Sequence, residues 1–169
     1  EGRLLNAIVN LSKGDLINVS DLDLPSVDLL RVTDTGDRGV AGLLYLLLRG
    51  VRQLARELLG IPQAGDTLGG ATAAFRRIKD LCVERLEIAV QPTAAFSAFP
   101  GPHHLASLLM SVADNLAPAA VVNIDAPGGV DGPRWATMMR KIAKRRPYLW
   151  RNHRTAVDSG YLETGTSSA

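Results

Sequence analysis

Apolar side chains recur every three or four residues along most of the chain, which is the spacing of the buried face of an α-helix. The clearest repeat predicts a helix over 40–59, ended by Gly60 and Pro62. Its apolar stripe consists of Leu44, Leu47, Val51, Leu54 and Leu58, and its polar face carries Arg49, Arg52 and Arg56. We therefore expect this segment to be an amphipathic helix on the core.

The same periodicity predicts helices on both sides of this one. Their expected ranges are 4–11, a turn or two after a cap at Ser20, 71–90, 103–117, 133–146 and 151–159. Gly14, Pro92, Pro118, Pro147 and Gly160 are the expected stops. For the helix over 133–146, Asp131 or Gly132 is the expected cap, and Trp135, Met138, Met139 and Ile142 are expected on one face.

Turn-forming residues separate these segments. Loops are expected over 33–39, 63–70 and 125–132, and an irregular connector over 91–102. The apolar run 119–124 fits either a strand or an extended tether. Because aromatic residues make up only 5% of the chain while Leu, Ala and Val abound, the core is expected to be aliphatic. The sequence predicts a mainly α protein, a helical array of about five to six helices.

Charge is distributed unevenly although the formal net charge is only +2. Residues 1–38 hold seven acidic and four basic side chains, whereas the interval between Asp131 and Asp158 holds eight basic ones and no acid. The eight are Arg134, Arg140, Lys141, Lys144, Arg145, Arg146, Arg151 and Arg154. They form a candidate phosphate-binding surface. A basic helix end that complements the helix dipole and is simply solvated fits the same charges equally well.

Few residues indicate chemistry. The chain contains no Gly-Lys-Thr or Gly-Lys-Ser phosphate-binding loop, and Cys82, His103 and His104 have no partners at metal-ligand spacing. Cys82 lies on an apolar stripe, which predicts a buried thiol. The apolar run 40–48 is about half the length of a membrane span and leads into arginines, so no membrane association is expected. A single cysteine and no apparent secretion signal favour the cytoplasm.

The C-terminal residues form a distinctive pattern. Leu149-Trp150 precedes a short predicted helix that carries Ala156-Val157, and small residues occupy 165–169. This pattern resembles the segment leading into the nucleotide-binding core of superfamily 2 helicases of the DEAD/DEAH type. The phrase Arg-Arg-Pro-Tyr-Leu-Trp-Arg-Asn-His-Arg-Thr-Ala-Val, residues 145–157, is most similar to large bacterial helicases of antiphage defence systems such as the Hachiman type.

The resemblance implies an ATP-driven motor on DNA or RNA, with Mg²⁺ as the companion of ATP. It implies a helical N-terminal accessory domain over 1–124 and, over 125–169, a loop, a basic helix and the lead-in to an α/β RecA-like core. A glutamine reads adenine in that family. Here His153 takes its place, with Tyr148 or Trp150 packing near the base, so adenine selectivity is in doubt.

On this interpretation the chain continues beyond Ala169 into the phosphate-binding loop, and this segment alone has no complete active site. Residues 134–154 then line the nucleic-acid path, and apolar or acidic surfaces dock a partner subunit, such as a nuclease or effector of a defence system. The alternative is a self-contained, non-enzymatic helical module whose basic C-terminal helix binds nucleic acid or a partner protein. In that alternative Trp150 is a core anchor and His153 an ordinary surface residue.

Overall fold

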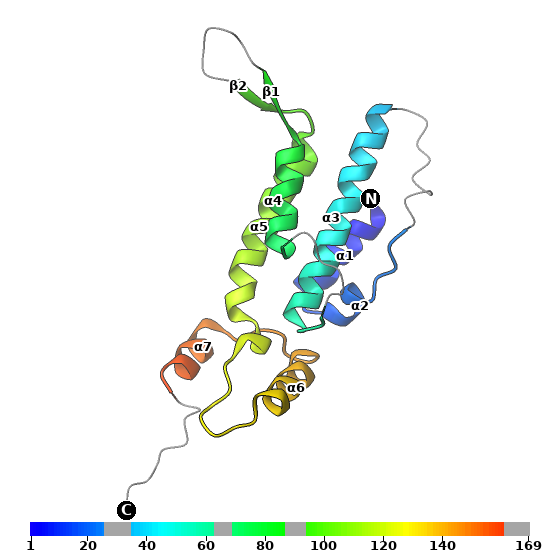
Figure 1. The fold of residues 1–169 in the computed structure, drawn as a ribbon. Coiled ribbons are helices and arrows are strands. Elements are labelled where there is room, and N and C mark those ends of the chain that lie inside the picture. The colour runs from blue at the N-terminus through cyan, green and yellow to red at the C-terminus, as the bar shows by residue number, and fades with distance from the viewer. Residues whose placement is uncertain (26–34, 63–68, 87–93, 161–169) are drawn as a thin grey trace, which may run out of the picture.

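The computed structural model describes residues 1–25, 35–62, 69–86 and 94–160 of the 169-residue chain, and it confirms the mainly helical fold (Figure 1). The elements are α1 (Gly2–Ser12), α2 (Leu16–Ser20), α3 (Thr35–Leu58), α4 (Ala71–Leu81), β1 (Val83–Leu86), β2 (Ala94–Ser97), α5 (Pro100–Ala119), the 3₁₀ turn η2 (Val121–Asn123), α6 (Gly132–Ala143) and α7 (Arg151–Asp158). No helix among these residues is long and apolar enough to cross a membrane.

Helix α3 lies at the centre of the main helical layer, between α1 and α2 on one side and α4 and α5 on the other (Figure 1). The predicted leucine and valine stripe faces inward, because Leu47, Val51, Leu54 and Leu58 are all buried. Phe75 of α4 is the largest fully buried side chain of the described residues. A core of aliphatic side chains around one phenylalanine matches the low aromatic content of the sequence.

The predicted helix over 71–90 is wrong in its second half. Helix α4 ends at Leu81, and residues 83–86 form β1, which pairs antiparallel with β2. Residues 83–86 pair one to one with 94–97, from Val83 with Ser97 to Leu86 with Ala94, and this pairing between segments favours a strand over a helix. Pro92 is therefore not the stop of this helix, and residues 87–93 lie outside the described part.

The irregular connector predicted over 91–102 is also replaced by regular structure. Strand β2 occupies its middle, and α5 begins at Pro100 rather than at His103. A proline fits the first turn of a helix because no intrahelical hydrogen bond is needed there. Phe99 pins this junction, since its ring lies 3.1 Å from the position that a Cβ would take on Gly39 of α3.

Two predictions near the N-terminus are corrected. Ser20 ends α2 instead of capping a later helix: its hydroxyl donates a hydrogen bond of 2.9 Å to the carbonyl of Ile17. Residues 35–39, predicted as loop, form the first turns of α3, so their turn-forming composition is overridden by the helix that follows. Residues 26–34 lie outside the described part, as do 63–68 of the second predicted loop.

The last three elements, η2, α6 and α7, form a smaller layer across one end of the main one (Figure 1). The backbone of 147–149 runs beside that of 119–121: Leu149 N–H donates to the Ala119 carbonyl at 2.8 Å, and Val121 N–H donates to the Pro147 carbonyl at 2.9 Å. The run 119–124 is therefore neither a full strand nor a free tether, since it holds one bridge, Ala120 to Tyr148, followed by η2.

Helix α6 is held by both of its predicted start signals. The Asp131 carboxylate accepts a hydrogen bond from Arg134 N–H at 2.9 Å, and Pro133 stands in the first turn. The Trp135 indole N–H donates to the Ile124 carbonyl at 2.8 Å. Met139 packs with Val121 and Ile124 in a small core. The four apolar residues expected on one face differ in burial, because Met139 is buried while Met138 and Ile142 are 43% and 40% exposed.

Candidate functional site

Four of the eight predicted phosphate-binding residues lie together at the C-terminal end of α6. Lys141, Lys144, Arg145 and Arg146 line an open groove of about 570 Å³ whose apolar part is formed by the exposed side chains Met138 and Ile142. Lys141 lies in the last turn of α6, and the turn that follows brings Arg145 and Arg146 back to it, because their N–H groups both donate to the Ile142 carbonyl at 2.9 Å. No acidic side chain of the described residues lines this groove. The clustering of these charges was a prediction from sequence, and their apolar neighbours were not.

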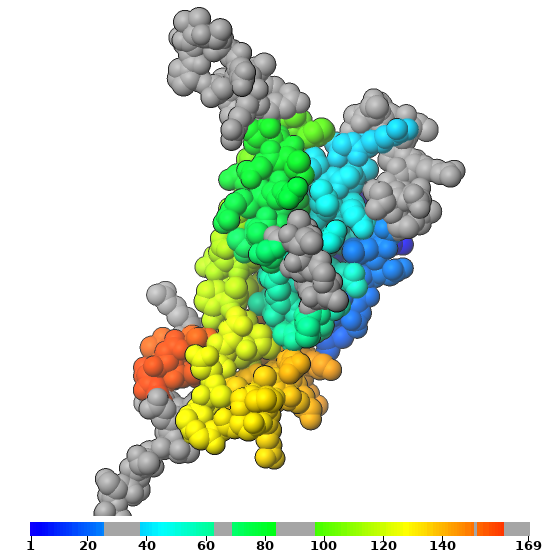
Figure 2. Space-filling model, in the orientation of Figure 1, coloured from blue at the N-terminus to red at the C-terminus, as the bar shows by residue number. Residues whose placement is uncertain are grey.

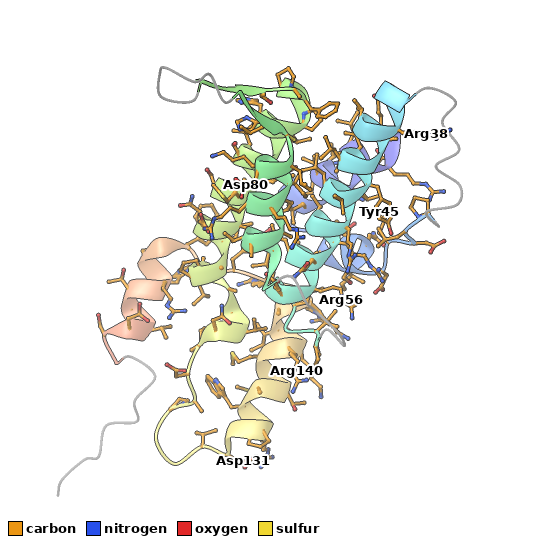
Figure 3. All side chains as sticks on the ribbon, turned by 45° about the horizontal axis from the view of Figure 1, so that its top comes forward. Arg38, Tyr45, Arg56, Asp80, Asp131 and Arg140 are labelled. Atoms are coloured by element: carbon orange, nitrogen blue, oxygen red, sulfur yellow. The ribbon has the colours of Figure 1, made fainter. Side chains whose placement is uncertain are left out.

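The other four predicted residues have different surroundings. Arg134 lies at the start of α6, at the opposite end of the helix, and Arg151 is the first residue of α7. The aliphatic stem of Arg140 lies where the two layers meet. Its Cγ is 3.1 Å from the position that a Cβ would take on Gly60. Figure 3 shows Asp131 at the free tip of α6 and Arg140 toward the end nearer α3.

Arg154 is engaged within the layer. Its Nε donates to Asp158 at 2.9 Å, and its guanidinium also donates to the Pro118 carbonyl at 3.2 Å. The bond to Pro118 holds α7 against the end of α5, whereas the bond to Asp158 lies within α7. These bonds favour a positioning role for Arg154, in contrast to the open cluster on α6.

A second groove of about 770 Å³ continues from the first, because both are lined by Ile142, Arg145 and Arg146. Segments far apart in sequence meet there, from the turn after α1 to η2, α6 and α7. Its apolar lining consists of Val121, Ile124, Met139, Ile142, Pro147, Leu149 and Val157, and its other lining residues are Lys13, Gly14, Arg145, Arg146, Tyr148, Trp150 and His153. Figure 2 shows the surfaces of α6 and α7 at the same end of the molecule.

All three residues that the helicase resemblance implicates line this second groove. Trp150 is 79% exposed and precedes α7, and exposed His153 lies in the first turn of α7. The exposure of Trp150 contradicts the alternative in which this residue is a core anchor. Tyr148 is half-buried, and its hydroxyl lies 3.3 Å from where a Cβ on Gly14 would be. Burial raises the pKa of Tyr148, so its phenol stays protonated.

Sequence reasoning missed Lys13 and the apolar lining from η2. Lys13 is one of four cations in an acidic N-terminal region, and only the fold brings it to the basic C-terminal segment. The alternation of exposed Met138 and buried Met139 was hidden because both fit a helical stripe. The density of charge within one segment can be predicted from sequence. The meeting of residue 13 with residues 121–124 and 142–157 depends on the tertiary fold.

Other chemistry has no assembled site in the described part of the chain. Its His, Cys, Asp and Glu side chains form no group of three or more that could hold a metal ion. Cys82 is buried, as predicted, and burial raises the pKa of its thiol. Comparison of the chain with models of known protein families, with curated proteins and with solved structures finds no match. Within the described residues, the two grooves are the surfaces that bring candidate binding residues together.

Proposed function

We propose that the two continuous grooves on α6 and α7 bind the phosphate backbone of a nucleic acid. The observation that carries this proposal is the convergence of Lys141, Lys144, Arg145 and Arg146 on a surface that no acidic side chain lines within the described part of the chain. Phosphate contacts supply most sequence-independent affinity for nucleic acid, and lysine and arginine make most of them. The formal charge of the whole chain is close to neutral, so the local arrangement, and not the total charge, favours this ligand.

A charge-matched pair of variants tests the proposal. The first carries Lys141→Gln, Lys144→Gln and Arg145→Gln in the groove, and the control carries Arg3→Gln, Arg76→Gln and Arg77→Gln, which remove the same charge from exposed positions on α1 and α4. Loss of three phosphate contacts is expected to weaken binding on the order of 100-fold near physiological salt, equally for oligonucleotides of different sequence. The proposal fails if both variants bind alike.

We further propose that the chain is the N-terminal accessory region of an ATP-dependent helicase of the DEAD/DEAH type. Local geometry supports the resemblance: an extended segment with Trp150 precedes an eight-residue helix, His153 lies in its first turn, and Val157 and Leu149 pack against the same small core. The expected RecA-like core strand at 165–169 lies outside the described residues. In this proposal His153 lies on the adenine side of the ATP site, and half-buried Tyr148 is the aromatic residue that packs near the base.

Peptide mapping of the natural polypeptide beyond Ala169, together with ATP hydrolysis by that polypeptide, tests the helicase proposal. We expect a Gly-x-Gly-Lys-Thr-like loop soon after Ala169 and hydrolysis stimulated by DNA or RNA. A polypeptide that lacks this loop, or that hydrolyses no ATP, contradicts the helicase proposal. It leaves the alternative of a helical module that binds nucleic acid through its basic surface, or a partner protein if the charge variants have no effect.

A further inference from the structure

We infer that the nucleic acid at this surface is single-stranded, and that one of its unpaired bases stacks on Trp150 in the second groove. The inference rests on the proposed nucleic-acid function and adds the form of the ligand. It is carried by the joint presence of an exposed indole, an apolar groove and cations at one place.

The exposure of Trp150 stands out against the other tryptophan of the chain. Trp135 has a structural role, with its indole N–H bonded to the Ile124 carbonyl and its ring packed on the small core. Trp150 is 79% exposed, the highest value among the exposed large apolar side chains of the described residues. A large apolar ring left in water costs free energy that burial against a ligand recovers.

The backbone beneath Trp150 is fixed although its ring is open. The preceding residue, Leu149, donates its N–H to the Ala119 carbonyl at 2.8 Å, and the Trp150 carbonyl accepts the Arg154 N–H at 2.9 Å. These two hydrogen bonds fix the backbone that carries the Trp150 ring at the start of α7. A positioned aromatic ring loses little conformational freedom when a second ring stacks on it.

The composition of the groove matches a base that carries phosphates. Apolar side chains such as Val121 and Ile124 provide a lining for a flat ring, and Lys13, Arg145 and Arg146 provide positive charge for phosphates. Its volume of about 770 Å³ lies within the roughly 300–1,000 Å³ typical of small-molecule pockets. Bases within a duplex are already stacked, so a duplex offers this groove phosphates and no free ring face.

The test compares three oligonucleotide probes of equal length, a 15-nucleotide oligothymidine, the same strand with abasic sites, and a 15-base-pair duplex. Binding to the wild type, to Trp150→Ala and to Trp150→Phe is measured with this chain at one salt concentration. We expect Trp150→Ala to lose on the order of tenfold affinity for oligothymidine and to bind the other two probes unchanged, while Trp150→Phe keeps most of the affinity. Oligothymidine is expected to quench tryptophan emission in the wild type and not in Trp150→Ala.

The outcomes distinguish failure of base stacking on Trp150 from failure of the proposed phosphate binding. If Trp150→Ala binds oligothymidine as the wild type does, or loses affinity for the duplex and the abasic strand equally, the inference is overturned and phosphate binding stands. If ATP displaces oligothymidine from the groove, a free nucleotide is the occupant and the inference is again overturned. If the wild type binds none of the probes, the proposed function fails as well. Unchanged circular dichroism of Trp150→Ala establishes that its fold is intact.

Discussion

Single residues decide how closely the helices approach. A Cβ built on Gly50 of α3 lies only 2.6 Å from Cε1 of Phe75, a ring that is fully buried in α4. Real Cβ atoms essentially never come so close to another heavy atom, so α3 and α4 pack at this distance because residue 50 has no side chain. The sequence predicts the helix over this position, yet nothing in it shows that its glycine serves a contact.

Substitution of Gly50 by alanine is expected to destabilise the protein. Overpacking costs about 1–3 kcal/mol, and the better helix propensity of alanine offsets up to about 1 kcal/mol of that cost. Gly42 is the matched control because it lies in the same helix with nothing within 4 Å of its Cβ position. Gly42→Ala should stabilise the protein by about 0.5–1 kcal/mol. Urea unfolding measures both, and equal effects of the two substitutions would contradict the packing argument.

Cys82 is expected to be unreactive until the protein unfolds. Its side chain is fully buried, and burial raises its pKa above the ordinary value of 9.0. A raised pKa leaves the thiol protonated at pH 8, and the thiolate is the nucleophile. Alkylation at that pH should therefore be much slower in the native protein than in urea, and should accelerate as pH rises. Native labelling as fast as that of the unfolded chain would show that the thiol is accessible.

At the level of elements, a side chain from α3 caps the start of α4. Gly70 precedes the helix and provides no side-chain cap, but Glu57 Oε1 accepts the Ala71 N–H at 2.8 Å. Gln53 donates to the same oxygen at 3.1 Å and so helps to orient it. This long-range cap is absent from the sequence signals for helix starts, which consider only nearby residues.

Replacement of Glu57 by alanine is expected to cost about 1–2 kcal/mol, because the buried Ala71 N–H loses its acceptor. Glu57→Gln keeps an acceptor oxygen and should cost less. Hydrogen exchange at the Ala71 amide, measured with urea unfolding, checks the location of the effect. Unchanged exchange in Glu57→Ala would mean that another group caps this helix.

Helices with a sustained apolar stripe were predictable from sequence, and their ends were less so. The segment 40–59 carries its own period and its own stop at Gly60, whose φ of 65° is the left-handed conformation expected after a helix. The hairpin of β1 and β2 was missed because the helical spacing of Phe75, Ile78 and Cys82 leads directly into β1. Each strand has only four residues, which is too short for a clear alternation of apolar and polar positions. Pairing with a partner strand, a contact between segments, decides such cases.

For the whole molecule, the two layers give the candidate site its form. The main layer supplies the turn after α1, and the smaller layer supplies η2, α6 and α7, so the second groove exists only where the two meet. The sequence indicated the basic cluster of Lys141 to Arg146 and offered Trp150 as a candidate site residue. It could not predict the groove, because Lys13 and Val121 reach it through folding alone.

The most direct test of nucleic-acid binding is the salt dependence of affinity for oligothymidine. Each phosphate neutralised on a single strand contributes about −0.7 to the slope of log K against log salt, so four contacts predict a slope of about −3. Removing Lys141, Lys144 and Arg145 should reduce the slope to about −1, while the charge-matched control keeps it near −3. A wild-type slope near zero, or the same slope in both variants, would contradict the account that this groove binds phosphates.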